Sequence, residues 1–342
     1  MRIGLGASEV PAALQVGTRT EEARLLGRGG VTRFAAAVVT AVLGFAGLAR
    51  ANADLDLQAC YDANDRGDYP AAIEACTRAL ESGDLSNDDA ALALNDRGNA
   101  YNRNGDFDRA IDSYNEAIRR KPNYADAYFD RANAYDFKDE YERAVKDYSK
   151  AIALRPDDAN AYLYRGNSRS LAGDYANAIR DYDKSIKLAP SYADVAIWSK
   201  GQALFNLGRF SDAAAAFRTY LQARPDYAFG GLWLYLAEAH LGKDGRAALA
   251  DRAQSLDLRQ WPGPIVRYYL GAAARDEVMA TARIGDPAYL DQQACEAAFY
   301  LGAFNLTAGN AEDARRDLTK AATQCPKSSA ERGAAQSELG RK

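Results

Sequence analysis

The chain has 342 residues, and its 43 lysines and arginines against 47 aspartates and glutamates give a formal net charge of −4. A hydrophobic fraction of 48% with 26% charged residues indicates a folded protein, and the absence of a basic excess argues against a nucleic-acid partner. A single histidine, His240, excludes a multi-histidine metal site and leaves any catalytic triad dependent on that one residue. It follows an apolar segment, so we expect it at a helix end or on the surface.

Residues 1–53 have the organisation of an export signal. An uncharged apolar run of fifteen residues, 34–48, follows several arginines and precedes the small-residue motif Ala51-Asn52-Ala53. We therefore expect export into a bacterial periplasm, with cleavage between Ala53 and Asp54. The run is shorter than the roughly 20 apolar residues of a membrane span, so we expect no such span in the mature chain.

Two alternatives to simple export stay open. The apolar run is also compatible with a short uncleaved anchor. Residues 57–60, Leu-Gln-Ala-Cys, resemble a lipoprotein processing motif that ends at Cys60, although Asp54 and Asp56 separate it from the apolar run. Outer-membrane lipidation at Cys60 is therefore the minor alternative.

A period of 34 residues runs through the first half of the chain. Two columns hold small residues, a third holds aromatic residues, and prolines close the units. The four columns are Gly98, Ala132, Gly166 and Gly201; Ala110, Ala144, Ala178 and Ala213; Tyr114, Tyr148, Tyr182 and Phe217; and Pro122, Pro156, Pro190 and Pro225. Each unit is predicted to form two amphipathic helices of about 14 residues, joined by turns such as Gly105-Asp106-Phe107.

The residue types explain why such units would stack. Small residues let the two helices of a unit approach closely, and the aromatic column fills the space against the next unit. Proline ends the second helix because it cannot donate the helical hydrogen bond. One hairpin cannot bury its apolar face alone, so several must pack together.

The spacing and these columns resemble the tetratricopeptide repeat (TPR) family. The resemblance implies an all-α fold, a right-handed superhelical solenoid of antiparallel helix hairpins. We expect five TPR-like units within residues 54–226, divided as 54–90, 91–124, 125–158, 159–193 and 194–226.

The second half departs from this rhythm and then returns to it. Residues 227–294 keep a helical period without the 34-residue repeat, so an irregular helical segment is expected there. A last TPR-like unit is expected at 295–326 and a C-terminal capping helix at 327–342.

Three strings of this half, GLWLYLAEAHL, QWPGPIVRYYLG and EAAFYLGAFNLTAGNAEDAR, resemble the new-lipoprotein-I family of bacterial cell-envelope TPR proteins. Members of that family are non-enzymatic dimeric adaptors that hold peptidoglycan hydrolases and a tail-specific protease together. The resemblance therefore implies envelope proteins or peptides as partners, and a homodimer. The family is lipidated, whereas this chain has no convincing lipoprotein motif.

The four cysteines are placed to close the two terminal hairpins. Cys60 and Cys76 occupy repeat positions 8 and 24, and Cys295 and Cys325 occupy positions 1 and 31, so each pair is symmetric about its turn. Residues equidistant from the turn of a helix hairpin lie side by side, within reach of a disulfide. In an exported chain we expect the bonds Cys60–Cys76 and Cys295–Cys325, and the alternative is four buried free thiols.

The TPR resemblance also implies which residues face a ligand groove. Position 9 of each first helix carries a primary amide, which can pair with the backbone of an extended peptide, but asparagine there also serves the fold locally. Apolar neighbours could form side-chain pockets, and Arg103 could meet a carboxylate. The candidate groove residues are Asn95, Asn99, Arg103, Phe129, Asn133, Phe137, Leu163, Asn167, Trp198 and Gln202.

Two further columns bear on the groove. The family's clamp for a C-terminal carboxylate uses lysines at position 5, where this chain has Asn95, Phe129 and Leu163, so that clamp is absent. The position-7 column, Arg97, Arg131 and Arg165, is expected to form a solvated or inter-helix charge face.

No catalytic motif accompanies the repeats: the sequence has no HExxH, no GxSxG and no Walker loop. We therefore expect no enzymatic activity and no cofactor. The favoured function is an exported scaffold or adaptor that binds other proteins or extended peptides in the cell envelope, linking wall hydrolases and a protease. The alternatives are a self-associating structural module, with residues 232–236 and the YYL and FYL strings as the contact, and an envelope enzyme.

Overall fold

The structure, a computed structural model, describes residues 50–341, and within this range every regular element is helical. The predicted leader lies outside the described residues up to residue 49. A first helix covers residues 50–65 and contains Ala53 and Asp54, the residues expected at the cleavage site. No helix of the described part is long and apolar enough to cross a membrane.

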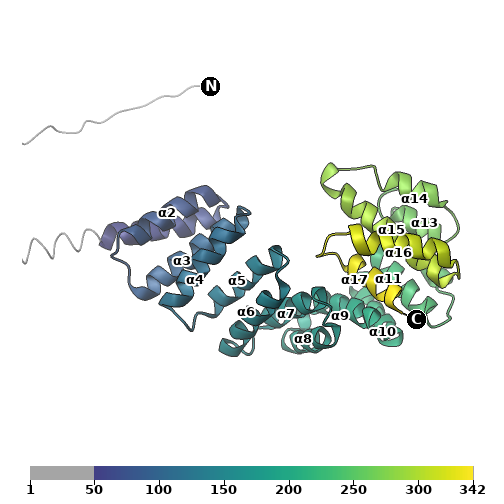
Figure 1. The fold of residues 1–342 in the computed structure, drawn as a ribbon, viewed down its shortest axis with the longest axis horizontal. Coiled ribbons are helices and arrows are strands. Elements are labelled where there is room, and N and C mark those ends of the chain that lie inside the picture. The colour runs from purple at the N-terminus through teal and green to yellow at the C-terminus, as the bar shows by residue number, and fades with distance from the viewer. Residues whose placement is uncertain (1–49, 342) are drawn as a thin grey trace, which may run out of the picture. The chain divides into compact units, whose positions relative to one another are not determined.

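The further elements are all short helices (Figure 1). In chain order they are α2 (Tyr69–Glu81), α3 (Asn87–Arg103), α4 (Phe107–Arg120), α5 (Ala125–Phe137), α6 (Tyr141–Leu154), α7 (Ala159–Leu171), α8 (Tyr175–Leu188), η1 (Pro190–Tyr192), α9 (Asp194–Asn206), α10 (Phe210–Ala223), α11 (Ala228–Ala239), α12 (Arg246–Ala253), α13 (Gly263–Tyr269), α14 (Arg275–Thr281), η2 (Pro287–Tyr289), α15 (Leu290–Thr307), α16 (Ala311–Gln324) and α17 (Ala330–Gly340).

Helices α3 to α10 pair into hairpins, and each hairpin packs on the next. This confirms the predicted all-α solenoid of helix hairpins. Two first helices begin earlier than predicted. α3 begins at Asn87 because the Ser86 side chain accepts the backbone N–H of Asp89, and the first helix of the last hairpin, α15, begins at Leu290.

The turns inside the hairpins follow from their glycine and aspartate residues. Gly105 and Gly173 have φ values of 81° and 83°, a left-handed conformation that glycine adopts without steric cost. The next residues, Asp106 and Asp174, cap α4 and α8 through their side chains. The glycine therefore reverses the chain and the aspartate starts the second helix.

The small-residue column packs against the aromatic column within each hairpin. A Cβ atom on Gly98 would lie 2.5 Å from the ring of Tyr114, and one on Gly201 would lie 2.6 Å from the ring of Phe217. Both rings have 0% exposure. The helices of a hairpin therefore approach so closely that the ring fills the space a larger side chain would need.

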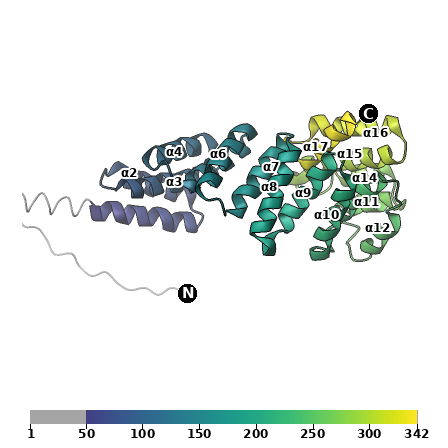
Figure 2. The same cartoon turned by 90° about the horizontal axis from the view of Figure 1, so that it is seen from below.

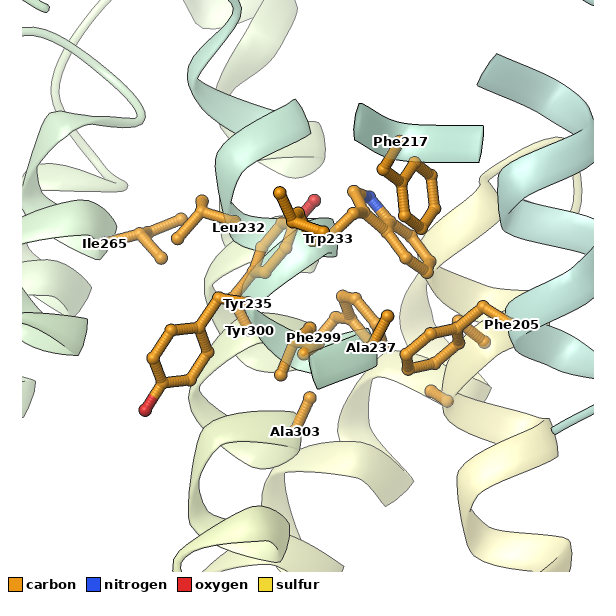
Figure 3. Packing of buried hydrophobic residues seen from close by; sticks show 14 of the residues in the cluster. Phe205, Phe217, Leu232, Trp233, Tyr235, Ala237, Ile265, Phe299, Tyr300 and Ala303 are labelled. Atoms are coloured by element: carbon orange, nitrogen blue, oxygen red, sulfur yellow. The ribbon is translucent and has the colours of Figure 1, made fainter. Parts of the chain in front are cut away.

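The C-terminal helices α11 to α17 gather around one apolar core (Figures 1 and 2). Trp233 lies at its centre, with ring centroids 5.3 Å from Phe299 and 5.0 Å from Phe205 (Figure 3). Residues 232–236 are all buried, as are Tyr269 and Tyr300 of the YYL and FYL strings. The segments suggested as a self-association surface are therefore occupied within the chain.

The capping helix α17 returns to the repeats and contacts α9, α15 and α16. Glu338 of α17 is 3% exposed, and its Oε1 lies 2.9 Å from Nε2 of His240. Arg341 forms an ion pair with Glu338 and donates to the carbonyl oxygens of Phe205 and Asn206 at the end of α9. His240 does stand at a helix end, as expected, but it holds α17 rather than facing solvent.

These contacts make Glu338 an anion in the folded protein. Burial acts to raise the pKa of its carboxyl, but the hydrogen bond to His240 and the charges of His240 and Arg341 outweigh burial and hold the pKa below its usual range. The His240 ring also stacks on Phe210, with centroids 4.0 Å apart. α17 is therefore held by the Glu338–His240 contact and by the two backbone acceptors of Arg341, while the ring stack on Phe210 orients His240.

Both predicted disulfides are confirmed. Cys60 and Cys76 join residues 50–65 to α2 with a Cα–Cα distance of 4.9 Å, and Cys295 and Cys325 join α15 to the end of α16 at 5.2 Å. A sulfur in a disulfide is not available for a thioether to lipid. The disulfide and the lipidation expected as an alternative at Cys60 are therefore mutually exclusive.

We predict that the double substitution Cys295→Ser/Cys325→Ser lowers the free energy of unfolding by about 3 kcal/mol, because the bond restricts a loop of the unfolded chain. Urea unfolding followed by circular dichroism, with and without dithiothreitol, measures this. Reductant should lower the wild-type midpoint and leave a variant that lacks all four cysteines unchanged. An equal response of both proteins would contradict the prediction.

Candidate functional site

The predicted amide column is tied to the fold in three units. The hydroxyl oxygens of Tyr114, Tyr148 and Tyr182 lie 2.8, 2.6 and 3.0 Å from the Oδ1 atoms of Asn99, Asn133 and Asn167 respectively. Each pair joins the two helices of one hairpin. The Oδ1 atom of each of these asparagines therefore serves the fold, as one of the two expected roles requires.

The fifth unit, residues 194–226, differs because its aromatic residue has no hydroxyl. Phe217 stands where the three preceding units have tyrosine. The side-chain oxygen of Gln202 therefore has no hydroxyl opposite it from which to accept a hydrogen bond. Gln202 is partly exposed and lines a cavity. Unlike the other three amides of the column, it makes no hydrogen bond to a tyrosine hydroxyl across its hairpin.

Two of the three position-7 arginines form the inter-helix charge pairs expected from the sequence, whereas Nε of Arg97 donates to Oγ of Ser113 at 3.3 Å. Arg131 makes a two-pronged ion pair with Asp147, with Nε–Oδ2 and Nη2–Oδ1 distances of 2.6 and 2.8 Å. Arg165 pairs in the same way with Asp181, at 2.9 and 2.7 Å. These pairs join the two helices of a hairpin, and the arginines are not displayed for a ligand.

Most apolar candidates serve packing between units. Phe129 has ring centroids 5.4 Å from both Tyr148 and Tyr164, and Leu163 packs on the C-terminal core. Phe137 is 64% exposed and stacks on Phe107 at a turn. Arg103 is exposed in the last turn of α3. The structure therefore does not bring these residues into one site.

Three predicted residues do meet in one place: Asn167, Trp198 and Gln202 line a cavity of about 480 Å³. Its walls come from α7 and α9, from tyrosines of α6 and α8, and from α17 with the segment that leads into it. The lining residues used below are Tyr141, Asn167, Ser170, Tyr175, Tyr182, Trp198, Ser199, Gln202, Asn206, Lys327, Arg332 and Gly333.

The cavity combines hydrogen-bonding groups with aromatic surface. Hydroxyls and amides alternate along the first-helix side, and Asn206 contributes a buried Oδ1 atom for which the structure shows no hydrogen-bond partner. Trp198 is braced by Phe217 and Tyr220 at centroid distances of 5.4 and 5.1 Å. Groups that donate and accept beside a rigid ring suit an extended peptide.

Sequence reasoning missed the C-terminal wall of this cavity. Gly333 places α17 against α8: a Cβ atom there would lie 3.1 Å from the Tyr175 hydroxyl. The small residue permits this approach, but a lone glycine in a polar helix carries no sign of its distant neighbour. The repeat pattern located the first-helix wall only.

A second polar cluster lies on α3 and α5. Asn95 donates its Nδ2 to Oδ2 of Asp130 at 2.8 Å. Burial is the main cause that raises the pKa of Asp96 and of Asp130 to about 6 each. Asp136 of α5 accepts from Ser168 at 2.8 Å, and burial raises its pKa to about 6 as well.

Comparisons with known proteins agree with this architecture. Family models described as TPR repeat match residues 98–136 and 138–170, and models described as tetratricopeptide repeat match residues 159–192 and 199–263.

Solved structures with similar folds include a tetratricopeptide repeat protein from Parabacteroides merdae, which is 17% identical with a TM-score of 0.53 over 84% of this chain and 99% of its own. YrrB, described as a TPR protein with an unusual peptide-binding site, is 18% identical with a TM-score of 0.50 over 58% of this chain and 99% of its own. MamA is 26% identical with a TM-score of 0.46 over 50% of this chain and 91% of its own. The first two likenesses support the fold.

We predict that Asp130→Asn stabilises the protein at pH 7.5 by about 1–2 kcal/mol. The folded-state pKa of about 6 lies above the unfolded value. The free energy of unfolding therefore falls as Asp130 ionises between about pH 4 and pH 6, and it stays lower above pH 6. The gain should therefore be small at pH 4.5. Urea unfolding at the two pH values, with the exposed Asp112→Asn as the control for net charge, tests this. A gain of equal size at both pH values would refute it.

Proposed function

The chain is a tetratricopeptide repeat protein, and on that premise we propose that it is a non-enzymatic scaffold that binds other proteins through an extended peptide segment. Stacked helical repeats present continuous surfaces for protein partners and are typical of interaction scaffolds. The binding site is the cavity between α7, α9 and α17. Its partners come from the cell envelope.

The observation that carries this proposal is the amide of Gln202 in the fifth unit, which lines the cavity and has no tyrosine hydroxyl opposite it. Gln202, Ser199 and Asn206 lie on successive turns of α9, and all three line the cavity. A peptide backbone offers alternating donors and acceptors, which such side chains can match. A cavity of about 480 Å³ is of the size that holds a few residues of a ligand.

Two features support a place in the envelope. The leader has the charged, apolar and small-residue regions of an export signal. Both hairpins at the ends of the described chain carry disulfides, which persist in oxidising compartments. The resemblance to envelope adaptors adds wall hydrolases and a protease as clients that the scaffold would hold together.

The self-associating alternative has weaker support. The apolar segment 232–236 and the rings of Tyr269 and Tyr300 are buried inside the chain and offer no surface to a second copy. A homodimer would need another face. The enzyme alternative has no support from a catalytic motif in the sequence.

The full chain, expressed with its own leader and purified from the envelope fraction, tests the scaffold directly. We expect it to retain a reproducible set of envelope proteins in a pull-down, and we expect the double variant Gln202→Ala/Asn206→Ala to lose them by at least fivefold. The matched control is Gln222→Ala, an exposed glutamine on α10 outside the cavity. Quantitative mass spectrometry of the eluates gives the ratio.

Comparison of the cavity variant with the control variant tests the location of the binding site separately from the scaffold function. Partners kept by both variants would place binding on another face of the scaffold. No partner retained by the wild-type chain would overturn the scaffold proposal and favour self-association, which sedimentation of the same preparation measures.

If the chain is exported, the N-terminal residue of the processed protein can be predicted. The protein isolated from the envelope fraction should begin at Asp54, because the peptidase is expected to cut after Ala53. N-terminal sequencing and intact mass determine this. The substitution Ala53→Arg should leave a precursor of higher mass, since a bulky charged residue does not fit the small-residue motif. Unprocessed chain confined to the cytoplasm would disprove export.

A further inference from the structure

We propose that the cavity between α7, α9 and α17 selects a peptide that bears a carboxylate, and that Lys327 and Arg332 bind this carboxylate. The inference rests on the proposed function and adds the charge of the ligand to it. The partner segment would be an extended stretch with aspartate, glutamate or a free C-terminus at the cavity.

The charges of the lining point to an anion. Lys327 and Arg332 both line the cavity, whereas none of its described lining residues is an aspartate or a glutamate. Within residues 50–341, neither cation has a carboxylate oxygen within 4.0 Å of its charged nitrogen atoms. Two cations without a protein counter-ion, in a partly enclosed space, attract a carboxylate more strongly than they would in open water.

Arg332 is oriented for this role. Its Nη1 donates to the carbonyl oxygen of Cys325 at 2.7 Å, which fixes the guanidinium plane. An oriented guanidinium can offer its remaining N–H groups to both oxygens of a carboxylate. Lys327 stands two residues after Cys325 and adds a flexible point charge.

The backbone that carries the two cations is held at both ends. The disulfide of Cys325 fixes the start of the segment, and Ser329 caps α17 by accepting the backbone N–H of Arg332. At the far end, Glu338 and Arg341 fix α17 to His240 and to the end of α9. Lys327 and Arg332 are therefore carried by a braced segment and not by a loose tail.

Groups on the α9 side complement the rest of a peptide. The buried Oδ1 of Asn206, for which the structure shows no partner, can accept a peptide N–H, and the amide of Gln202 can both donate and accept. Trp198 offers a ring surface. The carboxylate would face the α17 side and the backbone the α9 side.

The cations do not come from the first helices of the repeats. Position 5 of those helices holds Asn95, Phe129, Leu163 and Trp198, none of which is charged. Lys327 and Arg332 instead come from the segment after the last unit. The selectivity therefore depends on α17 being in place.

Peptide libraries on beads test the charge selectivity with the full chain. One random ten-residue library is attached through its C-terminus and so has no free terminal carboxylate, and a second is attached through its N-terminus. Peptides retained by the wild-type chain are sequenced, and the dissociation constants of the best binders are measured by fluorescence polarisation at two salt concentrations.

We expect retained peptides to be enriched in aspartate and glutamate, or to require the free C-terminus; comparison of the two libraries identifies the source of the carboxylate. Lys327→Gln/Arg332→Gln should weaken the best binder at least tenfold and reduce its salt dependence. The matched control Lys243→Gln/Arg259→Gln removes two exposed cations outside the cavity and should change affinity less than twofold.

The single variant Lys327→Gln keeps the hydrogen bond from Arg332 to the carbonyl oxygen of Cys325, so it separates loss of charge from a folding defect. It should weaken binding at least threefold and leave the melting temperature unchanged. Retention of neutral peptides that is lost in Gln202→Ala/Asn206→Ala would overturn the carboxylate inference and leave the peptide-binding proposal intact. Unchanged affinity in both cation variants would overturn the inference as well. Retention of no peptide by the wild-type chain would overturn both.

Discussion

In the hairpins formed by α3 to α10, a small residue of the first helix packs on a buried aromatic ring of the second, and this contact sets the geometry of the repeats. A Cβ atom on Gly98, Gly166 or Gly201 would lie within 2.7 Å of a ring carbon across the hairpin. The ring fixes the spacing of the two helices, and that spacing places the tyrosine hydroxyl beside the asparagine of the first helix. The packing of the two helices and the tyrosine–asparagine hydrogen bond are therefore coupled. A substitution in the small-residue column or in the aromatic column changes both.

This arrangement explains why the binding site lies where it does. In three units the tyrosine hydroxyl contacts the Oδ1 of the column asparagine, so much of the amide's hydrogen-bonding capacity is used inside the hairpin. In the fifth unit Phe217 has no hydroxyl, and Gln202 lines the cavity. Because Phe217 has no hydroxyl, Gln202 lacks the contact that ties Asn99, Asn133 and Asn167 to the fold.

The C-terminal helix gives the cavity its second wall and its positive charge. α17 is held by a carboxylate that is buried yet paired: Glu338 contacts His240 and Arg341, and breaking one of these contacts would leave a charge without compensation. The same helix approaches Tyr175 through Gly333 and carries Arg332 to the cavity. Stability of the C-terminal hairpin and composition of the proposed site are therefore linked, since both rely on the position of one helix.

The helix hairpins, the turns and the two disulfides could be predicted from the sequence, because each of them depends on residues within one unit and a 34-residue period makes their spacing visible. The sequence also identified Asn167, Trp198 and Gln202 among its groove candidates. Three findings required the folded structure: Phe129 and Leu163 serve packing, His240 contacts Glu338 across 98 residues, and Arg341 contacts the carbonyl oxygen of Phe205 across 136. Contacts at such separations occur once in the chain and follow no period. The cavity with its two cations arises from them, through the return of α17 to α9.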